Sequence, residues 1–183
     1  LSFDNVRRSG LIAITLKGGD SLKWARLTTG QDELILVTKR GQSIRFSEKD
    51  VRPMGRTASG VHAMRLKKGD EVVGMDAINP KDQNAKLLVV MENGFGKHAL
   101  IKQFKKQRRG GSGIKCAKIT PKTGSVIGSH VIDPEEEELI AISKKGQVIH
   151  TTLSTVPTLG RATQGVRIMR MDSGDAVASI TTL

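Results

Sequence analysis

The sequence predicts an all-β, propeller-like fold of repeated four-stranded antiparallel blades, each about 50 residues long. Three observations support this: a motif that recurs at a fixed spacing, short β-branched apolar runs bounded by glycine turns, and no sustained helical period. Repeats of this length are typical of propellers and solenoids. Four short strands per repeat is the number expected of a propeller blade.

Each repeat begins with a predicted hairpin. The three copies are ELILVTKRGQSIRF (33–46), KLLVVMENGFGKHA (86–99) and ELIAISKKGQVIHT (138–151). Their turn glycines, Gly41, Gly94 and Gly146, lie 53 and 52 residues apart. The run LLVVM is apolar on both faces, as expected for a strand in the middle of a packed stack.

A second block follows each hairpin. Its copies are GRTASGVHAMRL (55–66), RRGGSGIKCAKI (108–119) and GRATQGVRIMRM (160–171), and its glycines Gly60, Gly113 and Gly165 keep the hairpin spacing. A partial copy, RRSGLIAITL, spans 7–16. The alternative is a β-sandwich with accidental similarity, and the coinciding spacings argue against it.

We therefore predict one repeat domain over residues 1–183. It divides into a partial blade at 1–32 and blades at 33–80, 81–133 and 134–183. The partial blade should expose a strand edge that invites pairing with another chain or with further blades. Since the chain does not begin with methionine, we expect it to be a fragment.

The charge of the chain favours a polyanionic partner. Thirty Lys and Arg residues against 18 Asp and Glu give a net charge of +12. A solvated surface that only maintains solubility is the alternative. The chain has four Phe, one Trp and no Tyr, so nucleic-acid binding by base stacking on aromatic side chains is disfavoured. Binding through phosphate contacts remains open.

Other classes of site have little support in the sequence. The single cysteine, Cys116, fits a reducing cytoplasmic compartment and a place in the core rather than a nucleophile. We expect no metal and no cofactor, because the four histidines are scattered. No apolar run approaches 18 residues and no signal peptide is evident, so we predict no membrane partner. The acidic run 133–138 should be a solvated loop away from the binding path.

Cations recur in register with the repeats. Arg45, His98 and His150 each follow a hairpin glycine by four residues, and strand alternation predicts that they point away from the core. Arg56, Arg109 and Arg161 each precede the second glycine by four residues. A curved surface with one cationic position per repeat suits a long polyanion, and duplex DNA, with a charge every ~1.7 Å, is the first candidate.

The segment KKQRRGGSGIK (105–115) is the most basic stretch. Its glycines would allow backbone N–H groups to approach phosphate, while arginines bind phosphate oxygens in a bidentate fashion. A flexible solvated loop is the alternative. The full set of candidate DNA-binding residues is Lys39, Arg40, Arg45, Arg56, Lys97, His98, Lys105, Lys106, Gln107, Arg108, Arg109, Gly110, Gly111, Gly113, Lys115, Lys144, Lys145, His150 and Arg161.

The repeat pattern, DVRPMGRTASGV (50–61) and ENGFGK (92–97) resemble the C-terminal domain of DNA gyrase A over essentially the whole chain. The resemblance implies a β-pinwheel, usually of six blades, that wraps duplex DNA around a basic outer edge. QRRGGSG (107–113) is similar to the family's gyrase box, Gln-Arg-Arg-Gly-Gly-Lys-Gly, except that Ser112 replaces the cation. The family's box lies in the first blade, whereas the order of units here fits the last three to four. We therefore expect a box-like copy rather than the functional box.

The resemblance also implies a place in a larger enzyme. Type IIA topoisomerases cut DNA with a tyrosine, and this chain has none, so it would act only within a holoenzyme that hydrolyses ATP and supercoils DNA negatively. Its partners would be duplex DNA, the remaining part of gyrase A and, through it, the gyrase ATPase. The expected location is the cytoplasm, bacterial or organellar, with the nucleoid. Two alternatives remain: the tail of topoisomerase IV, which supports relaxation and decatenation, and a protein-binding propeller scaffold.

Overall fold

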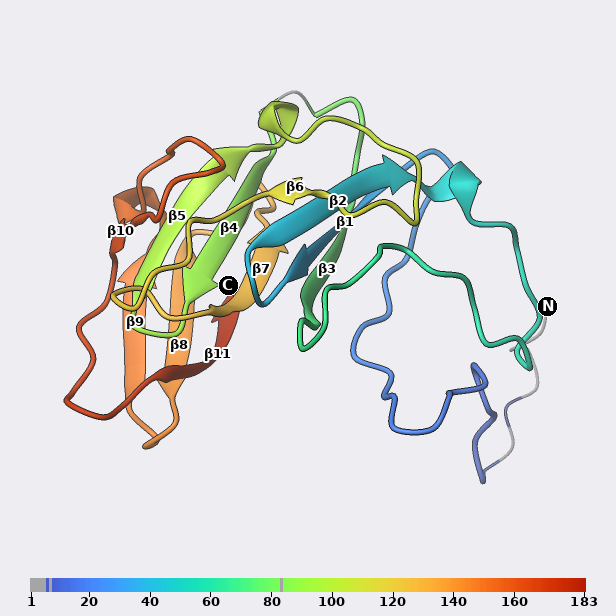
Figure 1. The fold of residues 1–183 in the computed structure, drawn as a ribbon, viewed down its shortest axis with the longest axis horizontal. Coiled ribbons are helices and arrows are strands. Elements are labelled where there is room, and N and C mark those ends of the chain that lie inside the picture. The colour runs from blue at the N-terminus through green and yellow to red at the C-terminus, as the bar shows by residue number, and fades with distance from the viewer. Residues whose placement is uncertain (1–5, 7, 83) are drawn as a thin grey trace.

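The computed structural model describes residues 6, 8–82 and 84–183, and its strands form three antiparallel sheets that lie side by side (Figure 1). The first sheet contains β1 (Glu33–Thr38), β2 (Gln42–Ser47), β3 (Val72–Ile78) and β6 (Ile114–Lys115). The second contains β4 (Lys86–Met91), β5 (Phe95–Leu100), β7 (Val126–Val131) and β10 (Val166–Arg167), and the third β8 (Glu138–Ser143), β9 (Val148–Thr152) and β11 (Val177–Thr182). One 3-10 turn follows each hairpin: η1 (Glu48–Asp50), η2 (Ile101–Gln103) and η3 (Leu153–Thr155). The predicted all-β, propeller-like fold is confirmed, and the described residues contain no α-helix.

Each of the first two sheets is completed by a strand from the following unit. The strand order is β3-β1-β2-β6 in the first sheet and β10-β5-β4-β7 in the second. Strand β6 follows β4 and β5 of the second sheet along the chain, but in Figure 1 it runs beside β2 of the first sheet. The second block of each repeat, at 108–119 and 160–171, is thus a donated block that joins neighbouring sheets.

The glycine of the donated block makes this pairing possible. A Cβ on Gly113 would overlap the backbone carbonyl of Ser43, and one on Gly165 would lie 2.6 Å from the carbonyl oxygen of Gly96. Both glycines also have positive φ, of 72° and 75°, which side chains rarely adopt. The recurrence of glycine at these positions therefore has a direct steric cause.

The apolar core lies between the sheets. Alternate residues of β4 point to opposite sides, so Leu87, Val89 and Met91 pack towards the first sheet while Leu88 and Val90 pack towards the third. All five are at most 1% exposed. The prediction that this run is apolar on both faces because it lies in a stack is confirmed.

The N-terminal unit differs from its prediction. The described residues of 1–32 contain no strand and are mostly exposed, so the expected strand edge is absent there. They contact the block 55–66 instead: Thr15 N donates to the Ala58 carbonyl oxygen at 3.1 Å. Trp24 is half-buried and lines a cavity of 470 Å³ with residues of β3, β7 and β11.

The row of sheets has an inner and an outer side. Strand β3 contacts β7, and β7 contacts β11, so these three strands line the inner side. The donated strands β6 and β10 lie at the opposite edge of their sheets. The basic loop before β6 therefore lies on the outer side, where the predicted DNA path would run.

Candidate nucleic-acid interface

The backbone of the basic loop 105–115 is held by the preceding block. Gly110 N donates to the carbonyl oxygen of Ala63 at 2.6 Å, and Gly111 accepts a hydrogen bond from Arg65 N at 2.8 Å. The loop is therefore not a free, flexible segment. Its glycines serve a defined turn, with Gly110 at φ 80°.

The side chains of this loop divide into two groups. Lys105, Arg108 and Lys115 are exposed, and no side-chain partner for them lies in the described part of the chain. Lys106 instead forms an ion pair with Glu33 at 3.2 Å. The Nε2 of Gln107 is buried and has no hydrogen-bond partner among the described residues. Three cations thus remain available for an external anion.

Arg56, Arg109 and Arg161 have a shared structural contact. The Nη1 of each donates to the backbone carbonyl two residues after the glycine of the preceding block: to Ile12 at 3.1 Å, to His62 at 3.2 Å and to Lys115 at 2.5 Å, respectively. Arg109 also donates from Nε to the Asp50 carbonyl at 2.9 Å. The register of these arginines therefore reflects a repeated hydrogen bond between neighbouring blocks.

Arg45 and Lys97 also join successive units. Arg45 pairs with Glu33 at 2.5 Å and donates to the carbonyls of Ile101 and Phe104 at 2.9 and 3.1 Å. Lys97 is fully buried, and its Nζ donates to three carbonyls and one hydroxyl of residues 160–163, at 2.6 to 3.2 Å. Burial lowers the pKa of Lys97 to about 8. The Lys97 side chain is therefore not accessible to an external phosphate.

The two histidines of this series lie in different surroundings. His98 is only 4% exposed, so the expectation that it points away from the core is wrong. The segment around Thr158 covers it, because Leu159 N donates to the His98 carbonyl at 2.8 Å and His98 N to that of Pro157 at 2.9 Å. Burial lowers the pKa of His98 to about 4, which keeps it neutral. His150 is exposed and pairs with Glu138 at 2.8 Å.

The cations of the hairpin turns are exposed; Lys39 and Lys145 contact residues of their own unit, and Lys144 contacts the hairpin turn of the preceding unit. Lys39 pairs with Glu71 at 2.8 Å, and Lys144 with Glu92 at 3.1 Å. Lys145 donates to a backbone carbonyl at 2.9 Å. Surface ion pairs of this kind contribute little to stability, so a phosphate could readily replace the carboxylate partner. This set consists of Lys39, Arg40, Lys144 and Lys145.

The structure also draws attention to a regular cation series that the sequence analysis missed. Arg65, Lys118 and Arg170 each follow the glycine of their block by five residues, and all three are exposed. No side-chain partner for them occurs in the described ranges. Alignment of the repeats shows the series directly. We call Arg65, Lys118 and Arg170 the outer cation series, because they lie in the block 55–66 and in the two matching blocks that supply the outer strands β6 and β10.

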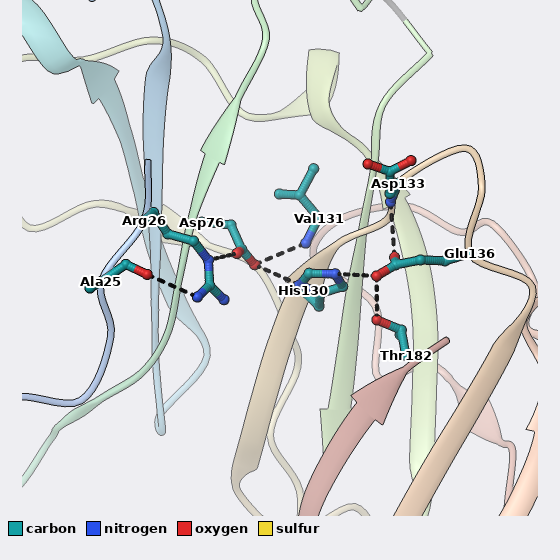
Figure 2. A network of polar contacts seen from close by, with 8 residues as sticks. All are labelled: Ala25, Arg26, Asp76, His130, Val131, Asp133, Glu136 and Thr182. Atoms are coloured by element: carbon teal, nitrogen blue, oxygen red, sulfur yellow. Dashed lines mark hydrogen bonds and ion pairs between the residues drawn. The ribbon is translucent and has the colours of Figure 1, made fainter. Parts of the chain in front are cut away.

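The inner side carries a different polar network (Figure 2). Asp76 of β3 accepts from Arg26 at 2.8 Å and contacts His130 of β7 at 3.1 Å. His130 contacts Glu136 at 3.0 Å, and Glu136 accepts from Thr182 of β11 at 2.6 Å. This chain of contacts connects the N-terminal segment with all three sheets.

The contacts of this network shift the pKa values of Asp76 and His130. Burial alone would raise the pKa of Asp76, but the hydrogen bonds from His130 and Arg26 outweigh it and hold this pKa below its usual value. The hydrogen bond to Asp76 raises the pKa of His130 against the effect of burial. The network is therefore held by a charged Asp76 paired with Arg26 and His130.

Other sites have no support in the described part of the chain. No group of three His, Cys, Asp or Glu side chains there could hold a metal ion. Burial raises the pKa of the Cys116 thiol to about 12, so its thiolate is not available at neutral pH. None of the described helices combines the length and apolar character needed to cross a membrane.

The chain is similar to known proteins along its whole length. The family described as "DNA gyrase C-terminal domain, beta-propeller" matches residues 2–29, 32–79, 85–133 and 137–183. The DNA gyrase A protein of Staphylococcus epidermidis (ATCC 12228) is 37% identical, and that of Aminobacterium colombiense 38% identical, each over 98% of this chain. The chain spans 20% and 22% of the length of these relatives.

Solved structures show the same relationship. The DNA gyrase A C-terminal domain superposes with a TM-score of 0.84 at 28% identity, covering 96% of this chain and 59% of that one. The C-terminal domain of DNA topoisomerase IV superposes with a TM-score of 0.90, covering 100% of this chain and 56% of that one, and its 24% identity shows a shared fold. The chain belongs to the DNA gyrase C-terminal domain family of β-propellers.

Proposed function

We propose that this chain binds duplex DNA without sequence specificity and bends it along the outer side of its sheets. It would do so as part of the tail of DNA gyrase A, supporting ATP-dependent negative supercoiling by the holoenzyme. The observation that supports this most directly is the outer cation series, which repeats one exposed cation in each of the blocks 55–66, 108–119 and 160–171.

The outer side suits the backbone of DNA rather than its bases. Among the described residues it presents no recognition helix, and specific reading of the major groove usually requires an inserted helix or ribbon. Exposed Lys and Arg side chains contact phosphates whatever the sequence. Lys105 and Arg108 extend the outer cation series in the loop before β6, and Lys115 extends it within β6. Arg40, Lys144 and Lys145 extend it at the hairpin turns.

Catalysis would take place elsewhere in the enzyme. The chain has no tyrosine, so it offers no nucleophile of the kind that type IIA topoisomerases use. Its contribution would be the path of the duplex, presented to the remaining part of gyrase A while the gyrase ATPase supplies the energy. We expect it to do this work with the nucleoid in the cytoplasm.

A binding titration tests the proposal. We expect labelled duplex DNA to bind more tightly than single strands of equal length, with a slope of log affinity against log salt of about −0.9 for each phosphate neutralised. The triple change Arg65→Gln, Lys118→Gln and Arg170→Gln should reduce that slope by about 2.7. Equal or tighter binding of single strands would contradict duplex binding.

A matched triple change is the control. Lys17→Gln, Lys23→Gln and Lys81→Gln remove the same charge from exposed positions outside the donated blocks. This variant should lose clearly less of the salt slope. If both triple variants lose the same amount, binding follows net charge alone and the outer path is wrong.

The linking number of DNA tests bending. A nicked plasmid is bound by the chain, ligated and freed of protein, and its linking number is read. We expect a weak shift or none, because three sheets present only a short arc and the box-like loop lies outside the first unit. A strong shift would mean that residues 107–113 act as a functional box.

A further inference from the structure

A cavity of about 540 Å³ lies between the second and third sheets. Its walls come from the connection between β3 and β4, the connection between β7 and β8, the turn η3 with the segment after it, and His98 of β5. Cavities of ~300–1,000 Å³ are typical of sites for small molecules. Among the described residues that line it, only His98 belongs to the candidate DNA-binding set, so the cavity is a separate feature.

In the interface between the first and second sheets, an arginine side chain occupies the equivalent place. Repeat register matches Arg45 with His98, since both follow their hairpin glycine by four residues. The Nη1 of Arg45 donates to the carbonyls of Ile101 and Phe104, in and directly after η2, at 2.9 and 3.1 Å. A guanidinium of the chain itself thus joins the first two sheets at this point.

Between the second and third sheets, the same turn is present without a guanidinium. In the repeat, Leu153 and Val156 take the positions of the two residues whose carbonyls Arg45 contacts. Val156 N donates to the Leu153 carbonyl at 3.0 Å, which closes η3 in the way that η2 is closed, and both residues line the cavity. Among the described residues, neither carbonyl accepts a hydrogen bond from a side chain. The place that Arg45 fills in one interface is therefore open in the next.

His98 itself has an unused hydrogen-bonding atom. Its side chain is shorter than that of arginine, and its Nε2 is buried with no partner in the part of the chain that the structure describes. Buried polar atoms in native proteins are nearly always paired. Burial lowers the pKa of His98 to about 4, so the imidazole is neutral and one of its nitrogens can accept a hydrogen bond. The interface therefore offers acceptors that lack a donor.

The charges around the cavity favour a cation. Asp82, Asp133 and Glu136 line it, and Lys86 is the one Lys or Arg among its described lining residues. The Oδ1 atoms of Asp82 and Asp133 each accept from a backbone N–H two residues further on, at 2.9 and 3.1 Å, which leaves the second oxygen of each for a ligand. Ile132 supplies an apolar part of the lining. An aliphatic cation suits this lining better than an anion does.

We propose that this cavity binds a small aliphatic dication that carries a guanidinium at one end and a primary ammonium at the other. The guanidinium takes the place that Arg45 fills in the preceding interface and donates to the carbonyls of Leu153 and Val156. The ammonium pairs with the carboxylates of the lining, and the alkyl chain packs on Ile132. Such a ligand links the second and third sheets as Arg45 links the first and second. The proposal does not depend on DNA binding, because none of these contacts involves the outer cation series.

Isothermal titration calorimetry of the full chain with agmatine, a butyl chain with these two end groups, tests the proposal. We expect one site per chain with a Kd of about 1 mM or tighter at ~0.15 M salt. His98→Arg supplies the chain's own guanidinium at this place and should weaken agmatine binding about tenfold or more. Absence of binding to the unchanged chain, or full binding to a His98→Arg variant that is folded by circular dichroism, would overturn the proposal.

Two double variants test the role of the carboxylates. Asp82→Asn with Asp133→Asn removes two charges but keeps the oxygen that each side chain uses for its backbone hydrogen bond, so agmatine binding should weaken about fivefold or more. The matched control, Asp20→Asn with Asp50→Asn, removes the same charge at exposed positions outside the cavity and should bind as the unchanged chain does. Equal weakening in the two double variants would show that binding follows net charge and not this site.

The effect of Lys86 and a second ligand identify the class of ligand. Lys86→Met removes a repelling charge, so agmatine should bind more tightly, and weaker binding would contradict a cation site. Nα-acetylarginine amide has the same guanidinium but no ammonium, and it represents an arginine side chain of another protein. It should bind more weakly than agmatine, because the carboxylates then have no partner. Equal or tighter binding of this amide would assign the cavity to an arginine side chain and overturn the small-molecule proposal.

Discussion

The Nζ of Lys97 lies 2.6 Å from the backbone carbonyl oxygen of Arg161, which belongs to the following unit. Lys97 is fully buried, and its remaining hydrogen bonds also go to residues 160–163. A cation expected to contact DNA thus holds one donated block in place. The chain uses part of its positive charge inside its own fold and part on its outer side.

Replacing Lys97 by Met should destabilise the fold. The change leaves buried carbonyls of residues 160–163 without a donor, and each such loss costs about 1–3 kcal/mol. We expect a decrease of about 3 kcal/mol in the free energy of unfolding, measured by urea denaturation. Lys102→Met, at an exposed position of η2, should change it by less than about 0.5 kcal/mol. A smaller decrease in the free energy of unfolding for Lys97→Met than for the control would contradict a stabilising role of the buried Lys97 hydrogen bonds.

Arg108 and Arg109 are neighbours with different predicted roles. Arg109→Ala removes hydrogen bonds to Asp50 and His62 and should cost about 1 kcal/mol of stability. Arg108→Ala removes an exposed side chain, so stability should stay within about 0.5 kcal/mol while the salt slope of DNA binding falls by about 0.9. Urea denaturation and anisotropy titrations measure the two quantities. Complete loss of binding in the folded double variant would show that the loop is a dedicated box rather than one part of a distributed surface.

Alanine substitutions at Gly110 and Gly113 distinguish the effect of a steric clash from that of backbone strain. Gly110 and Gly113 both have positive φ, 80° and 72°, so alanine at either position carries a similar conformational cost of about 1 kcal/mol. A Cβ at Gly110 meets nothing within 4 Å, whereas one at Gly113 overlaps the Ser43 carbonyl. Gly113→Ala should therefore lower the thermal midpoint by clearly more than Gly110→Ala. Equal losses would mean that β6 can shift away from β2 at little cost.

The pairing of Asp76 with His130 should make stability depend on pH. The pKa of His130 is raised, so its contribution is fully present below its unfolded value of 6.5 and is lost as pH rises through its folded pKa. The pKa of Asp76 is lowered, so its contribution is present above 3.8 and is lost as pH falls through its folded pKa. His130→Gln should therefore cost more stability at pH 5.5 than at pH 9. The comparison of the two proteins at each pH cancels the contribution of His98.

An equal cost of His130→Gln at the two pH values would show that this histidine is not charged in the network. His150→Gln is the matched control, because His150 also faces a carboxylate but is 56% exposed. Solvent screens that pair, so its replacement should change stability little at either pH.

The repeat pattern was sufficient to predict the all-β fold, because glycine spacing and paired apolar runs depend on local geometry. The exchange of β6 and β10 between sheets could not be predicted in the same way. Strand pairing depends on which edges meet in space, and a two-residue strand such as Ile114–Lys115 has no periodicity of its own.

The candidate site was predictable in position but not in all its residues. Register correctly grouped Arg56, Arg109 and Arg161, yet recurrence alone does not tell a side chain that contacts a carbonyl from one that faces solvent. Strand alternation placed His98 outside, because it does not include the segment around Thr158 that covers β5. The outer cation series was visible in the repeats, and exposure in the structure was needed to select it.

The exchange of strands has a consequence for how the chain folds during synthesis. Ser43 is paired with Ile114, 71 residues further along, so the first sheet stays incomplete until that stretch has left the ribosome. At about 5–20 residues per second this takes roughly 4–14 s. During that interval the edge of β2 is bare and open to mispairing. Cooperative, slow maturation from one end of the chain to the other is therefore expected, rather than blade-by-blade folding.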